Sequence, residues 1–157
     1  MILIDNTVLS NFALAGKLPV LENYCKDKGV TTKEVLMEFE RGINAGIFTN
    51  INLIWLKIID LANEEEKLLF MNIRKKLGAG EASCLAVAIN MGYDLLTDDM
   101  AVRKIALREG IRLSGSVGVL LELIRLKEIS IEMGNKILKD FIKYGYFSPV
   151  DRLDDLL

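Results

Sequence analysis

Hydrophobic residues follow two patterns along the 157-residue chain. Short continuous apolar runs, such as Ile2–Ile4 before Asp5, are typical of strands that are buried on both faces. Longer stretches with apolar residues three and four positions apart, often ended by glycine, are typical of helices. The runs predict strands at 1–5, 29–31, 52–59, 94–97 and 111–113. Helices are predicted at 8–15, 18–26, 32–41, 63–76, 81–91, 98–109, 114–127 and 131–144.

The alternation of strands and helices predicts the fold class. Strands that are apolar throughout and separated by helices indicate a parallel sheet covered on both faces, which is a three-layer α/β/α fold of the Rossmann-like kind. The length of 157 residues predicts one domain over residues 1–157, in which residues 130–157 form a C-terminal helical extension.

Acidic side chains follow two of the predicted strands. Asp5 ends the first strand, and Asp98 and Asp99 follow the strand at 94–97. Ligands of such sheets bind beyond the carboxyl ends of the strands, so these acids are placed for a site. Each of them is equally typical of a helix N-cap. One cap needs one acid, however, and two adjacent acids repel each other unless a cation lies nearby.

Two further acids lie in predicted helices. Glu81 falls in a first helical turn, where its charge suits the helix dipole, and that structural explanation is the stronger one for Glu81 taken alone. Glu38 shares a helix with Glu34, four residues away on the same face, where a solvated acidic surface is the ordinary interpretation. Its apolar neighbours Val35 and Phe39 indicate that this turn lies near the core.

The composition restricts the chemistry of such a site. The chain has no histidine, so the usual neutral-pH base and the usual zinc ligand are both missing. Carboxylates alone suit hard cations such as Mg²⁺ and Mn²⁺. The net charge of −2 argues against a passive nucleic-acid binder, whereas bound cations would supply positive charge locally. The basic clusters at 74–76 and 103–112 are either exposed helix faces or a phosphate-contacting rim.

Several motifs in order resemble those of PIN-domain proteins, a metal-dependent nuclease fold that includes toxin–antitoxin ribonucleases. The opening stretch 4–9 holds Asp5 and Thr7, and Val35-x-x-Glu38 follows. Leu77–Ala82 and Leu95–Asp99 resemble the third and fourth motifs. The stretch 115–121 and the end of the chain from Gly145 also fit a subgroup of small prokaryotic PIN proteins.

The resemblance implies a metal-dependent ribonuclease that hydrolyses phosphodiester bonds in single-stranded RNA, with DNA not excluded as a substrate. Its catalytic residues would be Asp5, Glu38, Glu81, Asp98 and Asp99. Of these, Asp5, Glu81 and either Asp98 or Asp99 would hold Mg²⁺ or Mn²⁺, and the Thr-x-Asp pattern of the superfamily favours Asp99. Thr7 and Ser116 would assist through hydrogen bonds.

Partners and location are expectations of the same kind. The relatives include toxins inhibited by an antitoxin protein, and they often form homodimers. The two cysteines match no metal spacing and favour a reducing cytoplasm, and no signal peptide or membrane span is expected.

The alternative function is a non-catalytic PIN-like domain for RNA binding or protein interaction. A receiver domain or a haloacid-type phosphatase fits poorly, because the first strand ends in Asp5-Asn6-Thr7 rather than Asp-x-Asp.

Overall fold

The computed structural model describes residues 1–48 and 51–157, which form a parallel sheet with helices around it. The strands are β1 (Ile2–Ile4), β2 (Gly29–Thr32), β3 (Lys57–Ile59), β4 (Asp94–Leu96) and β5 (Leu113–Ser114). The α-helices are α1 (Asn6–Leu14), α2 (Leu18–Cys25), α3 (Lys33–Asn44), α4 (Glu64–Ile73), α5 (Ala79–Met91), α6 (Met100–Arg108), α7 (Ser116–Arg125) and α8 (Ile131–Lys143). A short 3-10 helix, η1 (Leu153–Leu156), follows.

The strand order of the sheet reverses its direction at β1. The order is β3-β2-β1-β4-β5, and every neighbouring pair is parallel. The chain moves outward from β1 through β2 to β3 and then returns to place β4 on the other side of β1. Connections leaving β1 and β4 therefore diverge, which is the arrangement that opens a ligand site at the carboxyl edge. Asp5 lies at this edge, where its N–H donates to the carbonyl of Leu96 at 2.9 Å.

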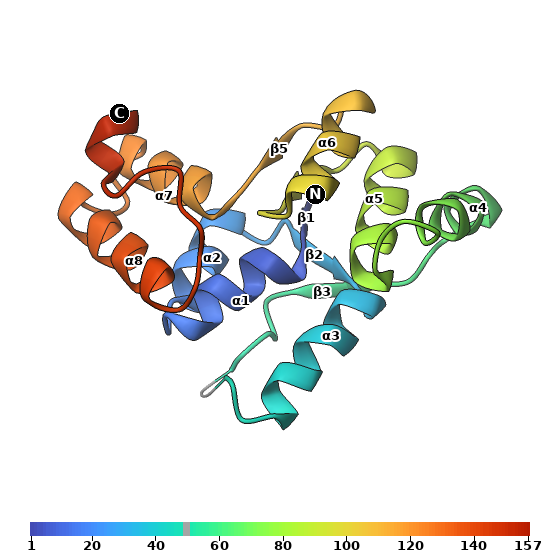
Figure 1. The fold of residues 1–157 in the computed structure, drawn as a ribbon, viewed down its shortest axis with the longest axis horizontal. Coiled ribbons are helices and arrows are strands. Elements are labelled where there is room, and N and C mark those ends of the chain that lie inside the picture. The colour runs from blue at the N-terminus through green and yellow to red at the C-terminus, as the bar shows by residue number, and fades with distance from the viewer. Residues whose placement is uncertain (49–50) are drawn as a thin grey trace.

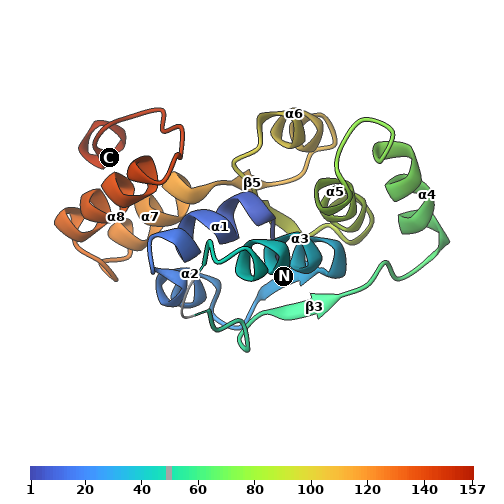
Figure 2. The same cartoon turned by 60° about the horizontal axis from the view of Figure 1, so that its bottom comes forward.

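Helices cover the sheet in two layers. Helix α5 contacts β1, β2 and β4, and α4 and α6 pack against α5 on the same side. Helices α1, α2, α7 and α8 contact one another and form the second group, which lies on the left in Figure 1. Helix α3 packs against both α1 and α5 and so closes the gap between the groups, as the turned view in Figure 2 shows. The predicted three-layer α/β/α fold is confirmed.

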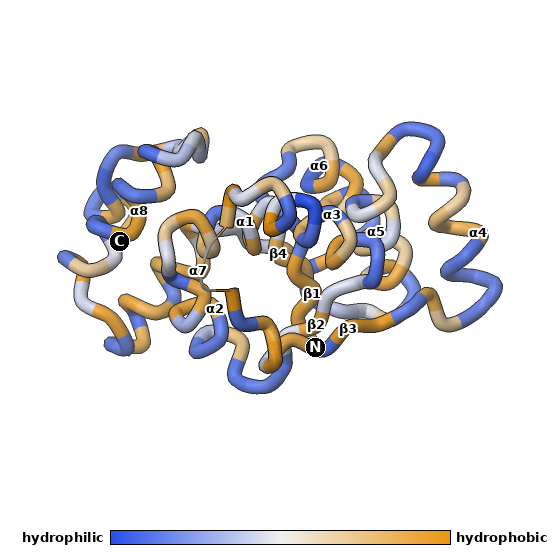
Figure 3. Tube along the Cα trace, turned by 90° about the horizontal axis from the view of Figure 1, so that it is seen from below, coloured by the Kyte–Doolittle hydropathy of each residue, from blue (hydrophilic) through white to orange (hydrophobic). Residues whose placement is uncertain are grey.

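Helix α5 is the central helix of its layer because its sequence is apolar nearly all round. Residues Ala82–Ala88 are all buried, as expected for a helix enclosed between the sheet and other helices. Figure 3 shows the corresponding hydrophobic colour along β1, whose Leu3 and Ile4 are fully buried. The buried start of α5 and the end of β1 therefore lie close together at the edge of the sheet.

The strand predicted at 52–59 is wrong over most of its length. Residues Lys57–Ile59 form β3, whereas the preceding residues turn. The Trp55 indole N–H donates to the carbonyl of Asn52 at 3.0 Å, and the Leu56 N–H donates to Leu53 at 2.9 Å. These local bonds take backbone groups that a longer strand would need for its ladder. An apolar run alone does not distinguish such a turn from a strand.

The helix predicted from Asp98 begins instead at Met100, with Asp99 as its N-cap. The last predicted strand at 111–113 is shifted to Leu113–Ser114. These shifts matter because they place Asp98 in the short connection between β4 and α6 rather than on a helix.

The C-terminal segment packs back onto the second group of helices. Phe141 of α8 meets Phe12 of α1 edge to face, with ring centres 4.9 Å apart. Leu153 of η1 is fully buried, and its N–H donates to Asn135 of α8 at 2.7 Å. None of the helices in the described ranges combines the length and the apolarity needed to cross a bilayer.

Candidate active site at the carboxyl edge of the sheet

Asp5 is a buried carboxylate at the end of β1. Its side chain is 1 % exposed, and it caps α1 by accepting from the N–H of Asn6 at 2.8 Å. Burial in a poorly solvated place raises the pKa of Asp5 from 3.8 to about 6, and the negative charge of Glu81 adds to this effect. Hydrogen bonds from Thr97, Asn6 and Thr7 act in the opposite direction. The cost of keeping this charge buried therefore exceeds what its hydrogen bonds return.

Two threonine hydroxyls fix the orientation of the Asp5 carboxylate. Thr97 Oγ1 donates to Asp5 Oδ2 at 2.8 Å, and Thr7 Oγ1 donates to the same oxygen at 3.1 Å. Each hydroxyl also accepts a backbone N–H, at 3.2 Å from Asp99 to Thr97 and at 2.9 Å from Asp98 to Thr7. Because the N–H groups occupy the acceptor side of both hydroxyls, the hydroxyl protons point at Asp5. The predicted auxiliary residue Thr7 thus lies in contact with Asp5.

Glu38 and Glu81 meet at the start of α5. Glu38 Oε1 accepts from the N–H of Gly80 at 3.0 Å, and Glu81 Oε2 accepts from the N–H of Gly78 at 3.1 Å. A Cβ at position 80 would lie 2.8 Å from both oxygens of Glu38, so a glycine is required for this approach. A Cβ at position 78 would contact both glutamates. Helices α3 and α5 therefore place two carboxylates near each other, although Glu38 and Gly80 are 42 residues apart in the sequence.

Glu34 is a further acid at this edge, and sequence reasoning assigned it to a solvated surface. Its Oε2 atom is buried and has no hydrogen-bond partner among the described residues. Burial raises the pKa of the Cys84 thiol well above its usual value, and the charges of Asp5, Glu38 and Glu34 raise it further. These three acids therefore lie near the same buried side chain of α5. The i, i+4 spacing of Glu34 and Glu38 was the signal that could have found this residue.

Asp98 faces away from this group. Its Oδ1 accepts from the N–H of Ser116 at 2.9 Å, and its Oδ2 accepts from the Ser116 hydroxyl at 2.5 Å and the Asn11 amide at 2.9 Å. A Cβ at position 115 would overlap the Asp98 carboxylate. Asp98 therefore ties α1, the β4–α6 connection and α7 together, and Ser116 acts on Asp98 rather than on Asp5.

Asp99 adjoins Asp5 through Thr97. Its Oδ1 caps α6 by accepting from the N–H of Val102 at 3.0 Å, and its own N–H donates to the hydroxyl that holds Asp5. In the sequence, Thr97, the shared partner, was interpreted only as part of the Thr-x-Asp pattern and was given no role of its own. A threonine directly after an apolar strand and before two acids was a usable signal.

The structure brings Asp5, Glu38, Glu81 and Asp99 to one edge of the sheet, whereas the side chain of Asp98 points elsewhere. Within residues 1–48 and 51–157, no three acidic or thiol side chains converge closely enough to hold one metal ion in the side-chain orientations described here. Glu38, Glu81 and Asp99 instead accept backbone N–H groups at helix starts.

The family assignment follows the whole length of the chain. The family model DUF3368, described as a PIN domain, matches residues 1–157. The chain belongs to the PIN-domain family. Neither the curated proteins nor the solved structures provide a significant match to it. PIN domains are a family of the nuclease type, and they generally use divalent metal ions.

The acids of this PIN domain fit a hard cation in their chemistry. The donor set consists of carboxylate oxygens, which Mg²⁺ and Mn²⁺ prefer. Asp5 is buried with a raised pKa, and the Glu34 Oε2 atom is buried without a donor, so both would gain from a nearby positive charge. Glu38 and Glu81 are each held by one backbone N–H, which rotation of the side chain can release.

Proposed function

We propose that this PIN domain is a Mg²⁺- or Mn²⁺-dependent ribonuclease that hydrolyses phosphodiester bonds in single-stranded RNA. The observation that carries the proposal is the buried Asp5 carboxylate, whose pKa is raised to about 6 beside Glu81. A fold stabilises such a charge poorly unless a cation binds there. Perturbed carboxylates of this kind concentrate at functional sites.

The residues divide into a metal-holding group and a positioning group. Asp5, Glu81 and Asp99 would hold the cation, and Glu38 would complete the site, directly or through a water molecule. Thr97 and Thr7 keep Oδ2 of Asp5 in place through the hydroxyl bonds described above. Asp98 and Ser116 would act as positioning residues, because they fix the loop that carries Asp99 against α7.

The chemistry requires both a metal ion and the carboxylates around it. A divalent cation lowers the pKa of a bound water molecule and stabilises the charge that develops on phosphate oxygens. Hydrogen bonds from two hydroxyls and one N–H fix the orientation of the Asp5 carboxylate. Glu38 and Glu81 are partly exposed, and the charge of Glu81 acts on Asp5. A carboxylate in such a place can orient an attacking water by accepting its proton. The chain contributes no histidine to this step, so carboxylates perform it.

Cleavage of RNA tests the proposal directly. Purified protein is incubated with a labelled single-stranded RNA in Mn²⁺, in Mg²⁺ and in EDTA, and Asp5→Asn is compared with the wild type. We expect metal-dependent cleavage that falls by on the order of 1,000-fold in Asp5→Asn, because several kcal/mol of charge stabilisation are lost. The melting temperature of the variant should be equal or higher. Cleavage by Asp5→Asn at the wild-type rate would contradict the site.

A non-catalytic PIN domain is the second candidate. It is favoured by the hydrogen bonds that occupy Glu38, Glu81 and Asp99 and by the lack of a converged metal group among the described residues. Calorimetric titration separates the two functions. Binding of Mn²⁺ supports the nuclease, whereas no binding of Mn²⁺ or Mg²⁺ supports the non-catalytic domain.

The proposal extends to location and assembly. We place the protein in the cytoplasm, with its two buried cysteines reduced, and propose a homodimer and an antitoxin protein as partners. The exposed apolar side chains of α4, Leu68 and Met71, are each 64 % exposed and give one helix a surface suited to contact with another chain. Sedimentation of the purified protein tests the dimer.

A further inference from the structure

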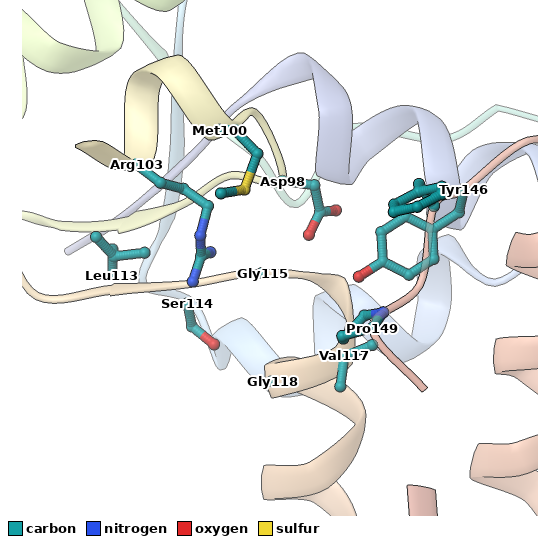
Figure 4. Close-up of a pocket in the computed structure, with 11 residues that line it drawn as sticks. Asp98, Met100, Arg103, Leu113, Ser114, Gly115, Val117, Gly118, Tyr146 and Pro149 are labelled. Carbon is teal, nitrogen blue, oxygen red and sulfur yellow. The ribbon is translucent and has the colours of Figure 1, made fainter. Parts of the chain in front are cut away.

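A cavity of about 550 Å³ lies beside the acidic edge, on the side of β4 and β5 toward the C-terminal segment. It is within the size range of small-ligand pockets. Its walls come from three parts of the chain: the start of α6, the β5–α7 connection and residues 146–149. Figure 4 shows the Arg103 side chain, the Asp98 carboxylate and the Tyr146 hydroxyl directed toward the space between these walls.

The C-terminal wall is held in place at both ends. The N–H of Tyr146 donates to the carbonyl of Phe141 at 2.9 Å, and the two rings meet edge to face at 6.0 Å. Beyond the cavity, Leu153 is buried against Gly134 of α8. The intervening Phe147 nevertheless has a ring that is 95 % exposed. A large aromatic side chain left exposed at a pocket rim offers a flat face for stacking against another ring.

The opposite side of the cavity offers hydrogen-bond donors. One Arg103 nitrogen donates to the carbonyl of Thr97 at 2.9 Å, which fixes the guanidinium and leaves further N–H groups for a ligand. Burial and the charge of Asp98 raise the pKa of Tyr146, so its hydroxyl is protonated and can donate. Gly118 lets the backbone of α7 approach the Ser114 hydroxyl at the base of the cavity, because a Cβ at position 118 would overlap that hydroxyl. The cavity thus combines an aromatic rim with fixed donors.

The cavity adjoins the acidic edge at Asp98. Asp98 lines it, and the N–H of Asp98 donates to the Thr7 hydroxyl that holds Asp5. A polymer lying across the acidic edge would therefore pass beside the cavity. We propose that the cavity binds one unpaired nucleobase of the RNA, which stacks on Phe147 while Arg103 and Tyr146 donate to its ring or carbonyl acceptors. This inference rests on the proposed function, and it explains how the site selects unpaired RNA.

The test measures binding separately from cleavage. A short fluorescent single-stranded RNA is titrated with the full chain in EDTA, and fluorescence anisotropy gives the dissociation constant. Substrates in which one nucleotide is replaced by an abasic ribose are compared with the intact RNA. The variants are Phe147→Ala, Phe147→Trp and the control Tyr144→Ala, whose exposed ring lies outside the cavity.

We expect one abasic position and Phe147→Ala each to weaken binding by on the order of 10-fold, as for loss of one stacked base. The two changes together should weaken it little more than either alone, because both remove the same contact. Phe147→Trp should retain binding, and Tyr144→Ala should bind as the wild type does. Arg103→Gln, which keeps a donor but not the charge, should fall between the wild type and Phe147→Ala.

The outcomes distinguish this proposal from the nuclease itself. RNA binding that depends on Phe147 and on one base, without metal-dependent cleavage, supports the pocket and contradicts the nuclease. Cleavage with binding that is insensitive to Phe147 and to every abasic position overturns the pocket and leaves the nuclease standing. A Phe147→Ala variant that binds RNA normally but changes from dimer to monomer overturns it also, because the ring then belongs to an interface between copies.

Discussion

Asp5 and Asp98 follow neighbouring parallel strands, and each accepts three hydrogen bonds, yet their surroundings differ. Asp5 is 1 % exposed beside Glu81, whereas Asp98 is partly exposed and bonded to helices on the other side. The hydrogen-bond donors of Asp98 are Ser116, which lies 18 positions later, and Asn11, which lies 87 positions earlier, so this carboxylate joins three elements. Burial and neighbouring charge, rather than the number of hydrogen bonds, therefore distinguish an acid suited to bind a cation from one that joins helices.

The largest expected effect separates the two members of the Asp98-Asp99 doublet. Asn replaces Asp well at an N-cap, so Asp99→Asn should leave the fold intact. If Asp99 holds the cation, its conversion to Asn should lower metal-dependent RNA cleavage by about 100- to 1,000-fold. Asp98→Asn, the matched control, should lower it by less than about tenfold. Initial rates at saturating Mn²⁺ measure both, and a reversed order would assign the metal to Asp98.

The pH dependence of stability should reveal the buried charge of Asp5. Its folded-state pKa of about 6 lies above the unfolded value of 3.8, so protonation favours the folded state. The stabilisation is fully present below about pH 4 and is lost as the pH rises through 6. Without metal, it should change by about 2.4 kcal/mol of unfolding free energy between pH 4 and pH 7.5.

Urea unfolding of wild type and Asp5→Asn at several pH values measures this term. The difference between the two proteins should change by about that amount in favour of Asn as the pH rises. A difference that stays constant from pH 4 to pH 7.5 would show that Asp5 is not perturbed.

Replacing Asp98 by Ala should have a smaller effect, which is a decrease in the free energy of unfolding. Asp98→Ala removes the acceptor for Ser116 and Asn11 and leaves their donors unmatched. We expect a loss of about 1–3 kcal/mol in unfolding free energy. Chemical denaturation measures the loss. An unchanged midpoint would mean that the connection between α1 and α7 does not depend on this carboxylate.

The sequence predicted the edge of the site better than its interior. An apolar run ending in Asp5 and another before Asp98 were enough to place both acids at the carboxyl ends of neighbouring strands, because buried parallel strands have a distinctive pattern. The central helix α5 was predicted because the middle of its sequence is almost wholly apolar and a glycine follows it. Its start at Ala79 rather than Glu81 was not, since a capping interaction with Gly78 decides it.

The details that sequence could not supply depend on contacts between distant segments. Glu38 lies beside Gly80 because α3 packs on α5, and no local pattern reports that contact. The direction of the Asp98 side chain depends on Ser116 and Asn11, one 18 residues later and the other 87 residues earlier. The turn at Trp55 likewise replaced a strand through bonds that an apolar run does not encode.

Stabilisation by Mn²⁺ tests whether Asp5 holds a divalent cation. Thermal unfolding at pH 7.5 is followed with and without Mn²⁺ for the wild type, Asp5→Asn and Asp98→Asn. At a Mn²⁺ concentration 100-fold above Kd, binding to the folded state contributes about 2.7 kcal/mol, which corresponds to roughly 5–10 °C for a chain of this size. If Asp5 holds the cation, the wild type and Asp98→Asn should both show that shift, and Asp5→Asn should shift by less than about 2 °C. No shift in the wild type, or an equal shift in Asp5→Asn, would contradict this role of Asp5.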